Sequence, residues 1–318
     1  MDGGEPVIAE ATLDARPRDP SWRSIDWRFV ARGLLTAGMI GAFAISSVPP
    51  LQHFLANGGS RLFIDARIYF RATELWIGGG NPWAAPVFDG TPFAAPPPSL
   101  LLNLPLLPLG ETVAVGTWAA LNTLAVGLLL YRLRLPIWWT LFLPVSEGWL
   151  SASPDLALAA LALLGAGGIS TLIKPYSIPA LLADRRWRAV VLGLVAAVIT
   201  IPLLPWGVFL DSRPAVEQAF REWGRPVSAF GDPLLMVLTA LALVSLGWRR
   251  GLALTTPGLI AMQPHYLVFS LGTIARSPIL AVPMTFAWPH VAAIGVIAYA
   301  IFEQVRTRGP RAWRRSDP

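Results

Sequence analysis

The sequence predicts an all-α integral membrane protein, and three observations support this: its composition, its long apolar runs and the placement of its arginines. Hydrophobic residues make up 54% of the chain and charged residues only 14%, with a mean hydropathy of +0.54, whereas soluble domains carry about 25% charged residues. Several apolar runs approach the roughly 20 residues that a helix needs to cross a bilayer. Because the runs are continuous rather than alternating, we expect a multi-span helical bundle with about eight crossings and no barrel.

Three regions are expected along the chain. Residues 1–28 form a polar tail, residues 29–302 contain the apolar runs of a polytopic domain, and residues 303–318 form a basic tail. An uncleaved first span is expected from about Phe29 to Leu55, with both tails in the cytoplasm because basic residues favour that side. The further spans are expected at roughly 111–131, 136–150, 153–183 (interrupted), 187–209, 233–248, 251–271 and 279–302.

The arginine clusters at the ends of the apolar runs set the expected topology. Placing every cluster in the cytoplasm leaves two outer loops, at about 52–98 and about 210–232. In the first loop, apolar residues recur at helical spacing from Asp65 to Trp76, which predicts an amphipathic helix at the membrane surface. A second such interfacial helix is predicted from about Ala215 to Trp223. Two helices lying along the outer surface suggest a roofed pocket.

Several classes of chemistry are disfavoured by what the sequence lacks. It has no cysteine, which excludes disulfides, a thiolate nucleophile and a cysteine-ligated metal. Its three histidines have no metal-ligand spacing and no nucleotide-binding loop occurs, so neither a metal nor another cofactor is expected. The net charge is +6, but the arginines lie at helix ends, so no nucleic-acid partner is expected.

Asp65 and Lys174 are the first candidate site residues. Asp65 begins the predicted amphipathic helix, where Asp often serves as a cap, and a capping carboxylate at a surface cleft can also accept a proton. Tyr69 lies one turn later on the same face and would line the same wall. Lys174 precedes Pro175 inside an apolar unit. An ionisable residue at membrane depth indicates a functional site, unless its side chain snorkels to the interface.

The remaining candidates lie near the expected outer side of the membrane. His265 lies within an apolar run, where a histidine either bonds to a neighbouring helix or serves a site. Glu147 and Asp155 fall near a predicted outer boundary and are expected to be solvated. Arg276 is also expected outside, where it would face a phosphate or a lipid headgroup.

Several short motifs, taken in order, resemble those of glycosyltransferase family 87. Each motif is short, and together they extend over most of residues 60–270. Asp65–Ala72, Gly79–Trp83 and the prolines at 96–98 resemble the first outer loop of that family. Ile173–Pro175, followed by the basic run 185–189, resembles its Lys-Pro segment. Pro264–Val268 resembles its late His-Tyr motif.

The resemblance implies a GT-C membrane fold and transfer of a sugar, typically mannose, from a polyprenyl-phosphate donor on the outer face of the membrane. Asp65 would be the general base of an inverting reaction, and Lys174 and His265 would lie near the donor phosphate. The implied partners are membrane lipids, the polyprenyl-phosphate sugar and a glycolipid or glycan acceptor. The residues assigned to donor or acceptor binding are Tyr69, Arg71, Asn81, Lys174, His265, Tyr266 and Arg276.

Two other interpretations stay open for this multi-pass protein of the inner or plasma membrane. It could be a non-catalytic transporter or flippase, or an inactive relative of the family in envelope assembly. The lack of a clear internal repeat argues against a transporter, but a roofed pocket over a membrane cavity also suits a flippase. If Asp65, Lys174 and His265 converge on one outward cavity, sugar transfer is favoured, and side chains that point apart argue against it.

Overall fold

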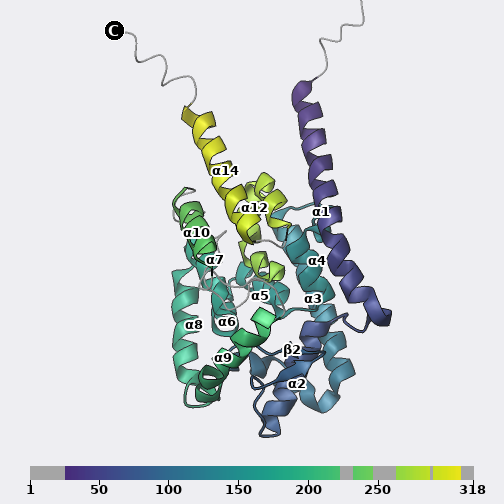
Figure 1. Ribbon diagram of the computed structural model, residues 1–318, viewed down its shortest axis with the longest axis vertical. Helices are drawn as coiled ribbons and strands as arrows, with labels where there is room; N and C mark the ends of the chain where they lie inside the picture. The colour runs from purple at the N-terminus through teal and green to yellow at the C-terminus, as the bar shows by residue number, and fades with distance from the viewer. Residues whose placement is uncertain (1–25, 223–231, 246–262, 287–288, 309–318) are drawn as a thin grey trace, which may run out of the picture. The chain divides into compact units, whose positions relative to one another are not determined.

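The second of two compact units holds nearly all of the described chain. The units are residues 1–38 and 39–318. Helix α1 (Trp27–Gly59) begins in the first unit and continues into the second. The computed structural model describes residues 26–222, 232–245, 263–286 and 289–308 (Figure 1). Parts of six expected segments lie outside these ranges: residues 1–25 of the polar tail, 223–231 of the second outer loop, 246–248, 251–262 and 287–288 of three expected spans, and 309–318 of the basic tail.

The described chain is mostly helical, as the sequence predicts. It also contains a small hairpin in which β1 (Pro86–Phe88) and β2 (Thr91–Pro92) pair antiparallel. Asp89 and Gly90 form its turn with positive φ angles of 49° and 73°, and Asp-Gly suits such a turn because both central residues need positive φ. The α-helices after α1 are α2 (Ile64–Ile77), α3 (Glu111–Leu133), α4 (Leu143–Leu150), α5 (Pro154–Leu163), α6 (Gly167–Ile173), α7 (Ile178–Ala183), α8 (Trp187–Thr200), α9 (Trp206–Glu222), α10 (Pro233–Ser245), α12 (Leu271–Arg276), α13 (Ala281–Met284) and α14 (Pro289–Arg308).

Short 3-10 helices interrupt the α-helices, and proline explains where they occur. A proline lies at or next to the first position of each of them. Proline is tolerated at a helix start but removes a hydrogen bond and clashes with the preceding turn further in. The 3-10 helices are η2 (Pro97–Leu102), η3 (Leu104–Leu109), η4 (Ile137–Leu141), η5 (Pro175–Ser177), η7 (Pro264–Ser270) and η8 (Pro278–Leu280).

Two helices of the described chain are long and apolar enough to cross a membrane. They are the Trp27–Ala56 part of α1 and the whole of α3. Both agree with predicted spans, the first from Phe29 to Leu55 and the second at 111–131. The bundle of about eight crossings is not seen, because the other expected spans within the described residues do not pass this test of length and composition.

Most of the other expected spans are shorter than predicted because proline divides them. The expected span 136–150 breaks at Phe142 between η4 and α4. The expected span 187–209 ends as α8 at Thr200, and Pro205 lies just before α9. The unit 153–183 was expected to be interrupted, and it consists of α5, α6, η5 and α7.

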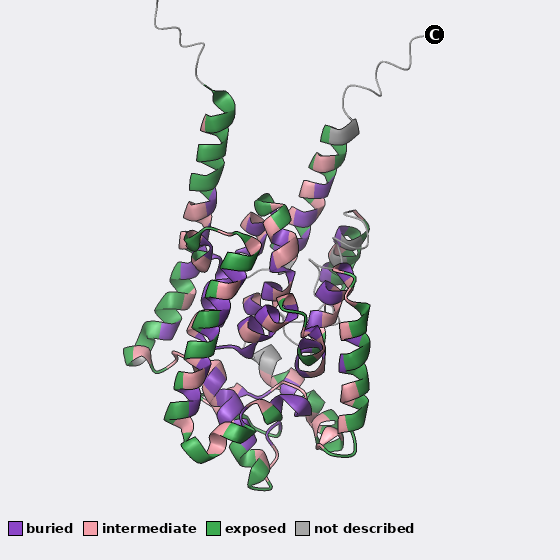
Figure 2. Cartoon of the chain, turned by 180° about the vertical axis from the view of Figure 1, so that it is seen from behind, coloured by how far each residue is buried: buried purple, intermediate pink, exposed green. Residues whose placement is uncertain are grey.

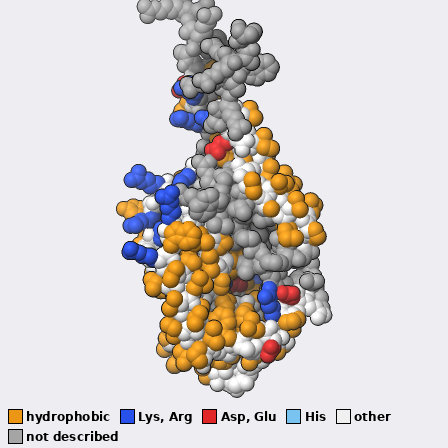
Figure 3. Space-filling model, turned by 90° about the vertical axis from the view of Figure 1, so that its left-hand side faces the viewer, with side chains coloured by type: hydrophobic (Ala, Val, Ile, Leu, Met, Phe, Trp, Pro, Cys, Tyr) orange, Lys and Arg blue, Asp and Glu red, His pale blue; other side chains and the backbone are white. Residues whose placement is uncertain are grey.

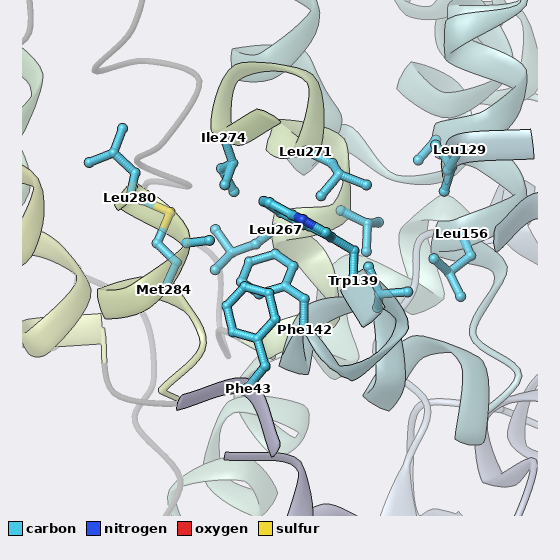
Figure 4. Packing of buried hydrophobic residues seen from close by; sticks show 14 of the residues in the cluster. Phe43, Leu129, Trp139, Phe142, Leu156, Leu267, Leu271, Ile274, Leu280 and Met284 are labelled. Atoms are coloured by element: carbon cyan, nitrogen blue, oxygen red, sulfur yellow. The ribbon is translucent and has the colours of Figure 1, made fainter. Parts of the chain in front are cut away.

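A core of large apolar side chains joins segments that are far apart in the sequence (Figure 4). Phe43 of α1 lies 5.0 Å from Phe142 and 5.5 Å from Trp139, measured between ring centroids. Leu271 and Met284 bring the C-terminal elements into the same core. Such packing holds short, broken helices together where long helices are lacking.

The outward surface is apolar as well, most clearly on α8. Only Val190 and Gly193 of this helix are buried, while Leu192 and Val198 are 66% and 63% exposed. Figure 2 shows the helix largely exposed along its length. Figure 3 shows hydrophobic side chains over much of the face on which α8 lies, with Lys and Arg gathered at one edge. Large apolar side chains therefore cover both the inside and part of the outside of the fold.

The two predicted interfacial segments are both helical. α2 covers the predicted range from Asp65 to Trp76, with Ile68 and Ala72 buried. It packs on the β-hairpin and on η2, with Trp83 and Phe93 in the shared core. The second helix, α9, begins at Trp206, earlier than predicted, and contributes Val216 to this core.

Candidate functional site

Short stretches of five elements bring ionisable side chains together. Two backbone hydrogen bonds fix the start of α2 to the end of α4: the Phe63 N–H donates to Leu150 at 2.8 Å and the Asp65 N–H to Ser151 at 2.9 Å. Phe63 has a φ of 61°, so the chain enters α2 through a left-handed turn. We call the assembled side chains the polar cluster: Asp65, Tyr69, Glu147, Asp155, Lys174, Tyr176, His265 and Tyr266.

His265 lies between three carboxylates. Its Nε2 atom is 3.3 Å from Asp155 Oδ2 and 3.9 Å from Asp65 Oδ2, and its Nδ1 atom is 3.7 Å from Glu147 Oε2. Gly148 permits this approach, since a Cβ there would lie 3.2 Å from the His265 Cβ. An imidazole with carboxylates on both sides is suited to accept and donate protons.

Lys174 forms a buried ion pair with Asp155. The Nζ atom lies 3.3 Å from Asp155 Oδ1, and the two side chains are 7% and 0% exposed. Asp155 also accepts hydrogen bonds from the Tyr176 hydroxyl at 2.5 Å and from Ser153 Oγ at 3.1 Å. The lysine therefore does not snorkel to a surface. Its charge is compensated within the fold, as a buried charge requires.

Three tyrosine rings surround the Lys174 ammonium. The Nζ atom lies 5.1, 5.3 and 5.8 Å from the ring centroids of Tyr69, Tyr176 and Tyr266. Tyr176 and Tyr266 stack on each other with centroids 4.0 Å apart. A cation within about 6 Å of an aromatic face is attracted by the ring quadrupole, so the tyrosines hold the ammonium in place together with Asp155.

Asp65 is the most accessible carboxylate of the polar cluster, at 22% exposed against 10% for Glu147 and 0% for Asp155. It does not cap α2, because the N-cap residue is Phe63 and no side-chain cap bond forms. Burial raises the pKa of the Asp65 carboxyl above its usual value, and the nearby positive charges of His265 and Lys174 oppose that rise. A carboxylate of raised pKa is a better proton acceptor than an ordinary one.

Three of the predicted binding residues have their contacts elsewhere. Arg71 Nε lies 3.1 Å from Glu111. The amide of Asn81 donates to Ser212 at 3.0 Å, and its Oδ1 atom accepts from the Trp83 N–H at 3.0 Å, so Asn81 ties the turn after α2 to α9. Arg276 Nη2 lies 3.3 Å from Asp184. The predicted Lys174, His265, Tyr69 and Tyr266 do lie with Asp65.

Sequence reasoning misplaced Glu147 and Asp155, which it expected to be solvated. Asp155 is fully buried at the centre of the polar cluster, and Glu147 is buried beside His265. The two residues flank the break between α4 and α5 at residues 151–153. The neighbouring Ser153-Pro154 sequence, typical of a helix start, was the available signal that Asp155 lies in the first turn of a helix, but it carries no information about burial.

No metal site is found in the part of the chain that the structure describes, where no group of three or more His, Cys, Asp or Glu side chains could hold an ion. A scan against protein-family models, a search of the curated proteins and a search of the solved structures find nothing that matches this chain. An assignment of the polar cluster therefore depends on its own geometry and on the sequence motifs that supply its residues.

Proposed function

We propose that this chain is a membrane glycosyltransferase that moves a sugar from a polyprenyl-phosphate donor to a lipid or glycan acceptor. The observation that carries the proposal is the convergence of Asp65, Lys174 and His265, which belong to separate sequence motifs and meet in one cluster. The purely structural roles, a helix-capping aspartate, a snorkelling lysine and a core histidine, do not require these three side chains to lie together. Their convergence is one part of the arrangement expected for sugar transfer, and the outward cavity that completes it stays a prediction.

The proposed reaction inverts the anomeric centre of the sugar. The Asp65 carboxylate takes the proton of an acceptor hydroxyl while that oxygen forms a bond to the anomeric carbon. The bond between the anomeric carbon and the phosphate oxygen breaks on the opposite face, and polyprenyl phosphate leaves with the electron pair. Asp65 suits the role of base because it is the accessible carboxylate of the cluster.

The phosphate that leaves is negatively charged and needs a fixed positive partner. Lys174 supplies an ammonium that is already held by Asp155 and three tyrosine rings. A preorganised charge stabilises the leaving group without rearrangement at the moment of reaction. A protonated His265 adds a second positive charge next to Asp65. No metal is part of this mechanism.

We propose a multi-pass placement in the inner or plasma membrane, with a GT-C-like bundle and the polar cluster on the extracytoplasmic side. The crossing-length helices α1 and α3 support membrane insertion. The exposed apolar side chains of α8 also support it, since a water-facing helix would carry a polar face. α8 has 14 residues, about 21 Å at 1.5 Å per residue, so it would cross only with help from neighbouring segments.

The experiment that tests the proposal measures sugar transfer from labelled polyprenyl-phosphate-mannose in membranes that contain the wild-type chain. Transfer above that of membranes without the chain is expected, with full activity in EDTA. Loss in EDTA that a divalent ion restores would contradict the metal-free mechanism. No transfer from this donor or from other polyprenyl-phosphate sugars, by a folded chain, would contradict the proposed function.

A proton-coupled transporter or flippase is a second candidate, and the position of His265 between carboxylates favours it. Buried chains of Asp, Glu and His at membrane depth commonly relay protons in transporters. Purified chain in sealed vesicles distinguishes the two candidates. A lipid or solute flux that depends on a proton gradient, without sugar transfer, would favour the transporter.

A further inference from the structure

A second charged group lies on α2, away from the polar cluster. Arg67 Nη1 is 3.4 Å from Glu111 Oε1, and Arg71 Nε is 3.1 Å from Glu111 Oε2. Both guanidinium groups also lie over the ring of Phe88 in the β-hairpin, 5.6 and 4.6 Å from its centroid. We call Arg67, Arg71, Phe88 and Glu111 the double-arginine site.

The double-arginine site has one positive charge more than its internal contacts need. Two guanidinium groups share a single carboxylate, and each guanidinium has five N–H donors. Arg67 Nε is buried without a hydrogen-bond partner in the described chain. That buried nitrogen is out of reach of solvent, but the arginine side chains as a whole are 35% and 42% exposed, so an anion from outside can reach other N–H groups of the two guanidiniums. A purely structural tie between α2 and α3 would need only one arginine.

The site lies where a helix of crossing length begins. Glu111 is the first residue of α3, and its neighbours Leu109 and Val113 are 57% and 49% exposed. At about 100° per residue, Arg67 and Arg71 lie roughly 200° and 240° around α2 from Asp65, on the opposite side of the helix. A cationic group beside exposed apolar side chains matches an amphiphile, with a charged head and a hydrocarbon tail.

We infer that the double-arginine site binds the phosphate of an anionic lipid headgroup. Guanidinium groups recognise phosphate oxygens through paired, charge-assisted hydrogen bonds, and the Phe88 ring holds both groups in position. The acyl chains of the lipid would lie along the exposed apolar residues at the start of α3. This inference depends on the proposed membrane placement of α3 and does not depend on sugar transfer.

The test uses native mass spectrometry of the full chain, purified in mild detergent, to measure how much phosphatidylglycerol stays bound. The Arg67→Gln/Arg71→Gln double variant is expected to weaken retention by about tenfold or more, since it removes both charged donors. Arg132→Gln/Arg134→Gln, at the other end of α3, is the matched control with two arginines changed, and it is expected to retain the lipid as the wild type does. Equal retention by the wild type and the Arg67/Arg71 variant would overturn the inference.

Glu111→Gln keeps the inference testable if the double variant does not fold. This variant removes the carboxylate that competes with phosphate, so lipid retention is expected to rise. If the arginines served only as a structural tie, loss of Glu111 would loosen the site and retention would fall, which would contradict the inference. Inorganic phosphate serves as the second probe. Displacement of the lipid by phosphate at millimolar concentration would identify a site for free phosphate and overturn the lipid assignment.

Discussion

Each ionisable side chain in the polar cluster lies close to other charged groups, which influence whether it is protonated. Three carboxylates, from Asp65, Glu147 and Asp155, lie within 4 Å of His265. The Lys174 ammonium pairs with one of them, that of Asp155. Desolvation favours the neutral form of a buried acid, and a neighbouring cation favours the charged form. For Asp65, burial raises the pKa of the carboxyl and the nearby charges of His265 and Lys174 lower it, with a net rise.

The pH dependence of sugar transfer follows from the raised pKa of Asp65. The base must be ionised, so the rate is expected to fall on acidification through a pKa that lies above the usual value for Asp. The folded-state pKa exceeds the unfolded one, so the effect of Asp65 on stability is most favourable below the unfolded pKa and is lost as pH rises through the folded pKa. A pH–rate profile of transfer in membranes measures the expected fall in rate on acidification. A rate that stays constant down to about pH 4, the ordinary range for Asp, would contradict the assignment.

Asp155→Asn should destabilise the fold strongly, because it leaves the buried Lys174 ammonium without its carboxylate. Breaking a buried pair on one side typically costs about 3–5 kcal/mol. The double variant Asp155→Asn/Lys174→Met removes both charges and should regain much of the lost stability. Thermal unfolding of the purified variants in detergent measures the coupling. Additive effects of the two changes would show that the ion pair does not stabilise the fold.

The candidate residues could be predicted from the sequence in part. Asp65, Lys174 and His265 were identified because ionisable residues are unusual in apolar surroundings and because they lie in recognisable motifs. Asp155 and Glu147 were misjudged, since hydropathy locates a residue along the chain and not inside or outside a fold. The ion pair between Asp155 and Lys174 arises only when α5 and the junction of α6 and η5 meet, which no local pattern encodes.

At the scale of elements, close helix contacts depend on small residues. α6 and α8 cross at Gly168 and Gly193, and a Cβ at Gly193 would lie 2.4 Å from Thr171 Cβ and 2.7 Å from the Gly168 carbonyl oxygen. Small residues let helix backbones approach closely where hydrogen bonds and packing hold helices together. α8 buries little else, so this contact fixes its position.

Gly193→Ala is therefore expected to destabilise the protein by about 1–3 kcal/mol, the usual cost of overpacking. Gly127→Ala is the matched control, because it changes a glycine inside α3 where a Cβ meets nothing within 4 Å. The control should be neutral or slightly stabilising, since alanine favours helix more than glycine does. Thermal unfolding of both variants compares them. Equal stability of the two would show that the α6–α8 crossing does not require Gly193.

Elements without internal proline were the easiest to predict. α2 and α3 lie close to their expected positions, since each has a clear start and one continuous pattern. The span expected at 136–150 was not recognised as two pieces, because hydropathy stays high across Phe142 while the backbone is extended there. Apolar content predicts burial or lipid contact, and proline ends or divides several of the apolar runs, although α1 continues through Pro49 and Pro50.

At the scale of the whole molecule, the central question is how the described helices lie relative to a membrane. α1 and α3 have crossing length, and the other apolar helices are shorter. In the proposed topology the basic clusters face the cytoplasm and α2 lies outside. The number of crossings was not predictable from hydropathy alone, because a short apolar helix that packs against others has the same composition as part of a span.

Cysteine labelling tests this topology cleanly because the chain has no cysteine of its own. Glu74→Cys on α2 is expected to react with a membrane-impermeant maleimide in intact cells. Arg132→Cys and Arg188→Cys, at predicted cytoplasmic ends, are expected to react only after lysis. All three positions are exposed in the fold, so access and not burial decides the result. Labelling of Arg132→Cys in intact cells would contradict the topology.

The most direct test of the proposed role of Asp65 compares transfer from labelled polyprenyl-phosphate-mannose by the wild type, Asp65→Asn and Asp89→Asn. Asp89 lies in the β-hairpin turn that follows α2 and pairs with Arg61 at 2.7 Å, outside the polar cluster, so its variant controls for loss of a carboxylate. Asp65→Asn is expected to lose about 10²–10⁴ in rate, the usual contribution of a general base, and to fold at least as stably, because the amide avoids a buried charge. Asp89→Asn is expected to keep the wild-type rate. Equal transfer by all three would remove Asp65 from the mechanism and contradict the central claim.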